Sequence, residues 1–286
     1  MAMIEENPVL AKNGETTGKV RAYWEQHPLF SLEVNRLYGE EEFFDELEKI
    51  KKEDTECFTD EYWRFNQSKG KRVLDVGCGP GWYSLQYALY GANVTAMDLT
   101  RKAVETTSKY AFIKKHDNVR ACQGDAQKMP FKDSCFDIVV SSGVLHHVPD
   151  PIAAFKEVRR VVKNTGEARV TLYYRNLLLR NRVAFKIMLV LLKISGARHH
   201  DVRSGVDPKT PDDFVRMYDG KNNPLGFAMT DSQWRELFHK AELHVSGAEL
   251  HFFPLRFLPK GGLLSPLRRF LESRLGFLIY YRLQPK

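Results

Sequence analysis

The stretch Val73–Ser84, VLDVGCGPGWYS, decides the fold. Val73, Leu74 and Val76 surround one acidic residue, a pattern typical of a buried parallel strand, and three glycines then alternate with other residues before an aromatic, helix-like run. Glycines at this spacing let the backbone turn sharply and approach a ligand closely, while the following helix presents unpaired N–H groups. The stretch therefore predicts a strand, a tight turn and a helix, with a ligand lying across the turn.

The glycine spacing differs from that of a dinucleotide site, which reads GxGxxG. Here the pattern is GxGxG, and an acid stands two residues before the first glycine. The negative charge of that acid does little to stabilise a bound pyrophosphate, which is an anion. The same charge stabilises a cationic amino-acid ligand. The stretch resembles the first motif of class I S-adenosylmethionine-dependent methyltransferases, in which the acid and the glycine loop hold the methionine end of the cofactor. The resemblance implies that this end is bound by Asp75, Gly77, Cys78, Gly79 and Gly81.

Acids at the ends of the next two expected strands extend the resemblance. Asp98 lies about 20 residues past the glycines, where a carboxylate accepts hydrogen bonds from both ribose hydroxyls. Asp125 follows the third strand, and the resemblance makes it the contact to the adenine amine; the alternative is that its carboxylate caps a turn. The other cofactor-binding residues that the resemblance implies are Leu99, Ala126 and Ser142.

Strands and helices alternate along the chain. This order predicts an α/β fold with a doubly wound, mostly parallel sheet and a ligand at the carboxyl ends of its strands. The resemblance implies seven strands with an antiparallel last strand. Strands are expected at residues 73–76, 93–98, 119–123, 136–140, 167–174, 243–253 and 276–283. The expected divisions are a helical N-terminal lid or arm (1–69), a Rossmann-like S-adenosylmethionine-binding core (70–175), a helical cap insertion (176–227), and the rest of the sheet with a basic amphipathic helix (228–286).

The residues before the first strand predict a lid. Residues 1–18 are polar and predict a mobile arm, and 20–28 predict a short helix stopped by proline. In related methyltransferases such a part covers the cofactor or the substrate, so Tyr23, Trp24 and His27 are lid candidates. The alternative is that these side chains pack into the core of the main domain.

Composition and charge limit the class of protein. The chain has 286 residues, 43% of them hydrophobic and 28% charged, which is typical of a soluble protein with one α/β domain and a cap. Its four cysteines lack metal-site spacing and nothing resembles a signal peptide, so we expect a cytoplasmic location. Residues 156–203 carry twelve Lys and Arg against three Asp and Glu. This charge favours an anionic substrate, a membrane surface or nucleic acid as a partner; the alternative is a solvated face.

Two apolar segments lie in the predicted insertions. Val183–Ile194, VAFKIMLVLLKI, is too short to span a bilayer and is either a buried cap helix or an interfacial helix. Ser265–Leu275 has leucines and phenylalanine on one helical face and arginines on the other. This second segment predicts a helix that docks over the active site or on a membrane surface.

The resemblance implies in-line transfer of a sulfonium methyl group, for which positioning supplies most of the rate. Enzymes that methylate exocyclic base amines carry an Asn/Asp-Pro-Pro-aromatic motif after the fourth strand. This chain has Ser141–Val144 there, so an amine of that kind is disfavoured as the acceptor. If the acceptor is a hydroxyl, His147, or less favourably His146, is placed to act as a general base; the alternative is a structural role for both. No metal-ligand cluster accompanies these motifs, so no metal is expected.

The favoured function is therefore methyl transfer to a small molecule, with O-methylation of a sugar, lipid or secondary metabolite first. One alternative is an RNA methyltransferase, although nucleic acid is the less favoured partner. Another is a membrane-peripheral or scaffolding protein that retains the methyltransferase fold, with the basic C-terminal half against an anionic membrane surface. Neither the oligomeric state nor the acceptor follows from the sequence.

Overall fold

The computed structural model describes residues 13–31, 34–55, 59–194, 208–220, 222–251, 270–271 and 273–286. Within them, the strands are β1 (Arg72–Val76), β2 (Asn93–Asp98), β3 (Val119–Gln123), β4 (Phe136–Ser142), β5 (Val162–Tyr173), β6 (Leu243–His251) and β7 (Leu278–Pro285). They join in a seven-stranded sheet with the order β3-β2-β1-β4-β5-β7-β6.

Helices connect and cover these strands. Those before the sheet are α1 (Asn13–Gln26), α2 (Glu41–Ile50), the π-helical turn η2 (Lys51–Thr55), α3 (Thr59–Trp63) and the 3₁₀ turn η3 (Phe65–Gln67). Those after β1 are α4 (Trp82–Leu89), α5 (Arg101–Ile113), the 3₁₀ turn η4 (Leu145–His147), α6 (Pro151–Val161), α7 (Leu177–Arg180), α8 (Arg182–Ile194), α9 (Pro211–Tyr218) and α10 (Asp231–Lys240).

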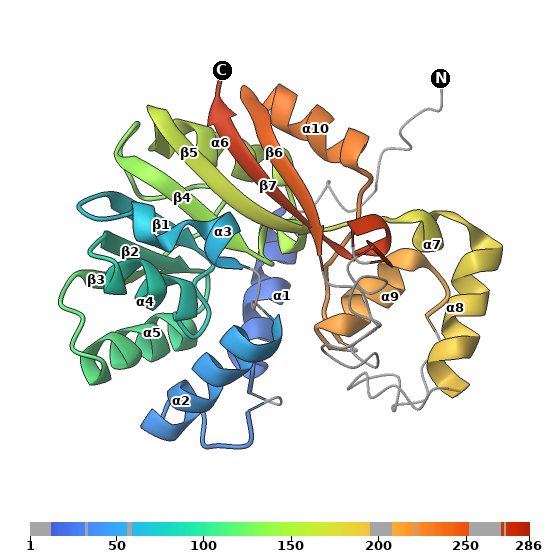
Figure 1. Cartoon of the computed structure of the whole chain (residues 1–286), viewed down its shortest axis with the longest axis horizontal. Coiled ribbons are helices and arrows are strands. Elements are labelled where there is room, and N and C mark those ends of the chain that lie inside the picture. The colour runs from blue at the N-terminus through green and yellow to red at the C-terminus, as the bar shows by residue number, and fades with distance from the viewer. Residues whose placement is uncertain are drawn as a thin grey trace.

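The sheet is doubly wound, as predicted. Strands β1 to β5 pair in parallel, and β7 lies antiparallel between β5 and β6. Parallel neighbours need crossover connections, which α4, α5 and α6 supply. Figure 1 shows α7, α8 and α9 grouped to the right of the sheet, and α1 and α2 below it. The predicted fold class is confirmed, with its antiparallel last strand.

Side chains that alternate along β1 face two different helical layers. Leu74 and Val76 join the core under α6 and α10, whereas Val73 joins the core under α2, α3, α4 and α5. Asp75 has the parity of Val73, so its side chain points into the layer that contains α4. This alternation therefore determines that Asp75 lies on the α4 side of the sheet.

The helices before the sheet pack into the core of the main domain and also border the cavity. Phe44 of α2 and Trp63 of α3 are fully buried in the core that contains α4, and the hydroxyl of Tyr62 donates to the Tyr281 carbonyl at 2.5 Å. The expectation of an arm over residues 1–18 is wrong for residues 13–18, because α1 begins at Asn13. The buried side chain of Thr17 explains the earlier start, since it packs over the cavity described below.

Helix α6 begins as expected and ends one residue early. The Asp150 carboxylate accepts a hydrogen bond from Ala153 N–H at 3.0 Å and Pro151 is the first helical residue, so the predicted cap is present. Strand β5 starts at Val162, five residues before the expected start. Its pairing with β4 shifts register between Phe136 and Ile138, which absorbs the additional residues.

The cap insertion has an apolar core of its own. Phe185 and Met188 of α8 pack with Phe214 of α9 and with Phe277 just before β7. Most of the predicted helix Ser265–Leu275 lies outside the described residues. None of the helices in the described ranges has the length and the apolar character that crossing a membrane requires.

Candidate functional site

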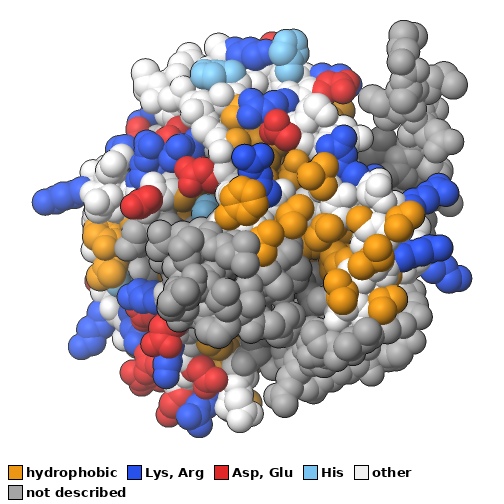
Figure 2. Space-filling view, turned by 45° about the vertical axis from the view of Figure 1, so that its right-hand side comes forward, with side chains coloured by type: hydrophobic (Ala, Val, Ile, Leu, Met, Phe, Trp, Pro, Cys, Tyr) orange, Lys and Arg blue, Asp and Glu red, His pale blue; other side chains and the backbone are white. Residues whose placement is uncertain are grey.

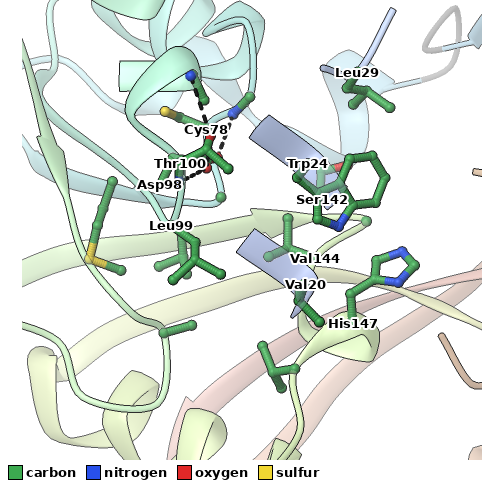
Figure 3. Close-up of a pocket in the computed structure, with 18 of the residues that line it drawn as sticks. Val20, Trp24, Leu29, Cys78, Asp98, Leu99, Thr100, Ser142, Val144 and His147 are labelled. Carbon is green, nitrogen blue, oxygen red and sulfur yellow. Dashed lines mark hydrogen bonds between the residues drawn. The ribbon is translucent and has the colours of Figure 1, made fainter. Parts of the chain in front are cut away.

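A cavity lies at the carboxyl ends of the parallel strands, between the sheet and α1, and Figure 3 shows some of the residues that line it. It is lined by Val20 and Trp24 of α1, by the loops after β1 to β4, and by Asp219 after α9. Among the residues predicted for the site, those that line it are Gly77, Cys78, Gly79, Asp98, Leu99, Asp125, Ala126, Ser142, His146 and His147. Asp75 and Gly81 are not among the lining residues.

The glycine turn is held against β2 and is open to the cavity. The N–H groups of Gly77 and Cys78 both donate to the Met97 carbonyl, at 2.7 and 3.1 Å. Gly77 has φ +76°, and a Cβ there would lie 2.3 Å from a methyl carbon of Val144. Only glycine fits this position, because the turn needs both a left-handed backbone and close contact with the loop after β4.

Gly81 serves the packing of helices instead. It has φ +89°, and a Cβ there would lie 2.8 Å from the hydroxyl oxygen of Thr107 on α5. The missing side chain lets the start of α4 lie against α5. Cys78 is buried beside this contact, and burial raises the pKa of its thiol well above the ordinary value. The thiol is therefore neutral. Cys78 lines the cavity as part of the glycine turn.

Asp98 ends β2 with its carboxylate at the cavity. One carboxylate oxygen accepts from the N–H and the hydroxyl of Thr100, both at 2.8 Å, and the other accepts from Gly79 N–H at 3.1 Å (Figure 3). Burial raises its pKa, while these hydrogen bonds act in the opposite direction. The carboxylate thus ties the glycine turn to the start of α5 and keeps acceptor capacity for a ligand.

Asp75 lies beneath the turn. Its side chain points into the layer of α4, where the Ser84 hydroxyl donates to it at 2.7 Å. Burial raises the pKa of Asp75 to about 7, opposed by the Ser84 hydrogen bond and reinforced by the charge of Asp98. The expected cradle of three carboxylates around one cavity is therefore wrong for Asp75, because strand alternation turns this side chain away from the lining.

Asp125 lines the cavity and also closes a turn. Its carboxylate accepts from the backbone N–H of Gln127 at 2.8 Å and from the side-chain amide of that residue at 3.2 Å. The Gln127 amide also donates to the Thr17 hydroxyl of α1 at 3.2 Å, and its oxygen accepts from Asp150 N–H at 3.0 Å. Asp125 therefore both caps its turn and lines the cavity. Ser142, on the opposite wall, donates to the Tyr83 hydroxyl at 2.8 Å.

Two buried histidines lie at the far end of the cavity. His147 Nδ1 lies 2.5 Å from the Leu225 carbonyl, and its Nε2 lies 3.0 Å from a carboxylate oxygen of Asp219. His146 Nδ1 accepts from the backbone N–H of Tyr173 at 3.2 Å. Burial, reinforced by His147, lowers the pKa of His146 well below its usual value, so this ring is neutral.

Asp219 was not among the residues predicted for the site. Its side chain is nearly buried, accepts from the Tyr173 hydroxyl and faces His147. Its backbone carbonyl accepts from the Tyr23 hydroxyl of α1 at 2.7 Å, and Trp24 meets the His147 ring edge-on at 5.5 Å between centroids. The polar loop after the helix at 211–218 is the feature of the sequence that could have indicated Asp219. Its contact with His147 joins residues that are 72 positions apart.

Comparisons with known proteins match part of this chain to methyltransferases. Residues 74–170 match the family described as "Methyltransferase domain". The chain is 38% identical over 103 residues to the uncharacterized methyltransferase YcgJ of Bacillus subtilis, covering 36% of this chain and 41% of that protein. It is 33% identical over 108 residues to the ubiquinone biosynthesis O-methyltransferase of Coxiella burnetii, covering 38% and 46%. The matched segment thus spans less than half the length of both relatives.

Solved structures extend the likeness of the fold beyond that segment. A chain solved in complex with the Haloferax volcanii Trm112 methyltransferase activator superimposes with a TM-score of 0.55 at 16% identity, covering 85% of this chain and 95% of that one. An S-adenosylmethionine-dependent methyltransferase of Mesorhizobium loti gives 0.54 at 15% identity, covering 79% and 96%. Residues 74–170 therefore match a methyltransferase domain, and the chain as a whole has a fold similar to that of these solved structures.

Proposed function

We propose that the cavity binds S-adenosylmethionine and that the chain transfers its methyl group to a hydroxyl of a small-molecule acceptor. The observation that carries this proposal is the Asp98 carboxylate at the end of β2, beside a glycine turn that faces the same cavity. A carboxylate at this place in a doubly wound sheet accepts hydrogen bonds from ribose hydroxyls. The methyltransferase match over residues 74–170 supports the same ligand.

The residues present fit this cofactor. An added Cβ at Gly79 would meet its nearest neighbour, Leu29, only at 4.0 Å, so a ligand can approach the bare backbone there. The pKa of Asp75 is raised to about 7, so any positive charge placed near it stabilises the ionised form of this carboxyl. Asp98 and Gly79 would hold the ribose and methionine parts, and the turn at Asp125 would hold the adenine end.

The cofactor, when bound, supplies an electrophilic methyl group. The chain's own contribution is to position the acceptor and to exclude water. Helix α1 covers the cavity with Trp24, and Tyr23 fastens the helix to the loop after α9. The apolar side chains Val20, Leu29 and Val144 line the same cavity as His147, so we propose an apolar acceptor that carries a hydroxyl. The relative named for ubiquinone biosynthesis supports this choice.

Calorimetric titration with S-adenosylmethionine tests the cofactor proposal. We expect binding to the wild-type protein and a loss of about 100-fold in affinity for Asp98→Ala, because two hydrogen bonds to an ionised carboxylate contribute roughly 3 kcal/mol or more. Asp117→Ala, which removes an exposed carboxylate from the turn before β3, is the matched control and should bind normally. Absence of binding to the wild type, or equal affinity in both variants, would contradict the proposal.

The dependence of stability on pH tests the state of Asp75. Its pKa is higher in the folded chain than the ordinary value of 3.8, so the folded chain binds the proton more tightly and stability falls as pH rises from about 4 to about 7. We expect Asp75→Asn to be more stable than the wild type at pH 8 by about 2–4 kcal/mol, and to lose this advantage at pH 4.

Denaturant unfolding of the two proteins at both pH values measures the difference. S-adenosylmethionine should reduce the difference in stability between Asp75→Asn and the wild type at pH 8, because a cation near the carboxylate favours its ionised form. Ser84→Ala is the companion variant, and it should increase the loss of stability above pH 7 by removing the hydroxyl that donates to Asp75. Parallel stability curves for the wild type and Asp75→Asn would show that Asp75 is not a buried titrating acid.

We also propose that α8 rests on an anionic lipid surface from which an apolar acceptor enters the site. Its side chains Val183, Ile187, Val190 and Leu191 are between 54% and 67% exposed and repeat at helical spacing, opposite the buried Phe185 and Met188. Exposed Arg180, Arg182 and Lys186 flank them, and no acid occurs in residues 176–194. Figure 2 shows apolar side chains gathered beside lysines and arginines on this side of the molecule.

The combination of apolar and basic side chains favours lipid over nucleic acid. A solvated or RNA-binding face needs the cations but gains nothing from four exposed aliphatic side chains, whereas an interfacial helix uses both. A helix of this length lies in the plane of the headgroups. The exposed face of α8 thus supports the membrane-peripheral expectation and weakens the RNA alternative.

Vesicle flotation tests the lipid surface. We expect binding to phosphatidylcholine vesicles that contain phosphatidylserine, weaker binding without it, and a decrease of tenfold or more for Ile187→Asp combined with Leu191→Asp, because two apolar side chains are replaced by charges. Phe112→Asp on α5, where the side chain is 85% exposed, is the control for an exposed apolar residue elsewhere. Equal flotation of all three proteins, or binding of a labelled RNA but not of vesicles, would contradict the proposal.

A further inference from the structure

Among the residues that the structure describes, one lysine and no arginine line the cavity. The lysine is Lys51, whereas the acids that line the same cavity are Asp98, Asp125 and Asp219. Lys51 is 7% exposed, although lysine side chains are ordinarily found at the surface. The groups around this buried cation therefore decide which part of a ligand fits beside it.

The register of α2 directs Lys51 inward. Phe44 and Leu47 are fully buried on one face of the helix, and Lys51 follows Leu47 by four residues, so it lies on the same face at the helix end. Lys49 and Lys52 lie off this face and are exposed. The helix thus places the charge of Lys51, and not the charges of its neighbours, against the main domain.

Aromatic rings surround the ammonium group of this lysine. Its Nζ atom lies 4.9, 5.5 and 4.8 Å from the ring centroids of Phe30, Trp82 and Tyr83. The faces of such rings attract a cation, and apolar surroundings strengthen an ion pair that forms among them. Rings carry no net charge, so an anionic group that enters this cluster adds an attraction of a different kind.

Hydroxyl groups add hydrogen-bond donors at the same place. The Tyr83 hydroxyl oxygen accepts from Lys51 Nζ at 3.4 Å and from the Ser142 hydroxyl at 2.8 Å. Because this oxygen accepts twice, the Tyr83 hydroxyl interacts with any further group as a donor, and an ammonium group has donors only. This part of the wall therefore fits a ligand group that only accepts hydrogen bonds and carries negative charge, which is the chemistry of a carboxylate.

The cluster lies next to the glycine turn. Trp82 and Tyr83 are the first residues of α4, directly after Gly81. Burial raises the pKa of Asp75 beneath the turn, and the charge of Lys51 is among the influences that oppose this rise. The proposed cofactor has its methionine part at this turn, and that part ends in a carboxylate.

We propose that Lys51 and Tyr83 form a carboxylate subsite of the cavity. The inference rests on the proposed binding of S-adenosylmethionine and adds a binding residue, Lys51, that lies outside the matched segment 74–170. A carboxylate has two sources here, the amino-acid end of the cofactor and an acidic group on the acceptor. The position beside the glycine turn favours the cofactor as the source.

Calorimetry with S-adenosylhomocysteine and its carboxamide tests the cofactor as the source. The carboxamide keeps the amino group and replaces the carboxylate by a neutral group. We expect the wild type to bind the acid about tenfold or more tightly than the amide, because the amide loses a charge-assisted hydrogen bond. Lys51→Met, which keeps an unbranched side chain without the charge, should reduce this preference to about twofold by weakening the acid alone, and Lys51→Arg should restore most of it.

Lys52→Met is the matched control, because it removes the charge of the next lysine, which is exposed and donates to Glu48. This variant should keep the preference of the wild type. Tyr83→Phe removes one donor and should give an intermediate preference. Unchanged binding of the carboxamide shows that each variant is folded.

Titration with 4-hydroxybenzoate and 4-hydroxybenzamide, in the presence of S-adenosylhomocysteine, tests the acceptor as the source. A preference for the benzoate that Lys51→Met abolishes would support the subsite and assign it to the acceptor. Preferences that Lys51→Met leaves unchanged, or equal affinities for acid and amide in both experiments, would overturn the inference. If S-adenosylhomocysteine and its carboxamide bind equally well, the subsite does not serve the cofactor and the cofactor proposal stands; if neither binds, the proposed function fails as well.

Discussion

The hydrogen bonds between the Asp98 carboxylate and the backbone N–H groups of Gly79 and Thr100 organise this end of the molecule. They join the turn after β1 to the turn after β2, so that two segments about twenty residues apart form one wall. The carboxylate is half-buried and burial raises its pKa, so these hydrogen bonds compensate in part for the lost water. The same carboxylate keeps acceptor capacity on the cavity side, which is what the proposed contact with ligand hydroxyls requires.

The second constraint is the meeting of α1, the cap and the loop after β4 around Asp219. Its carbonyl is bound by α1, its carboxylate is bound by β5 through Tyr173, and the same carboxylate faces His147. The glycine turn and the two histidines lie within the segment 74–170 that matches the methyltransferase family, whereas α1, Tyr173 and Asp219 lie outside it.

Much of the sheet could be predicted from sequence because its signals are local. The pattern of Val73–Ser84 predicts a strand, turn and helix, and β2 and β3 have the expected bounds. Asp98 and Asp125 were placed at the cavity because parallel strands end at one edge. Asp75 was misplaced for an equally local reason: its parity along β1 matches Val73, so the side chain faces α4 and Ser84. Strand alternation, applied to one more residue, would have predicted this position.

The end of the cavity at His147 and Asp219 could not be predicted in the same way. The contact between His147 and Asp219 depends on how the cap packs against the sheet, and no periodicity in 176–227 reports that packing. Residues 1–18 were expected to form an arm because their glycines disfavour a helix, yet Thr17 and Val20 pack over the cavity and α1 begins at Asn13. In both cases tertiary contacts outweigh the local preference.

Hydrogen–deuterium exchange with and without S-adenosylmethionine tests the central claim most directly, since it reports on every wall of the cavity at once. The account predicts slower exchange on binding in the glycine turn at 77–81, in the loops at 98–101 and 124–127, and in α1, with little change in the far strand β6. Unchanged exchange at 77–81 and 98–101, with protection confined to other parts of the chain, would contradict it.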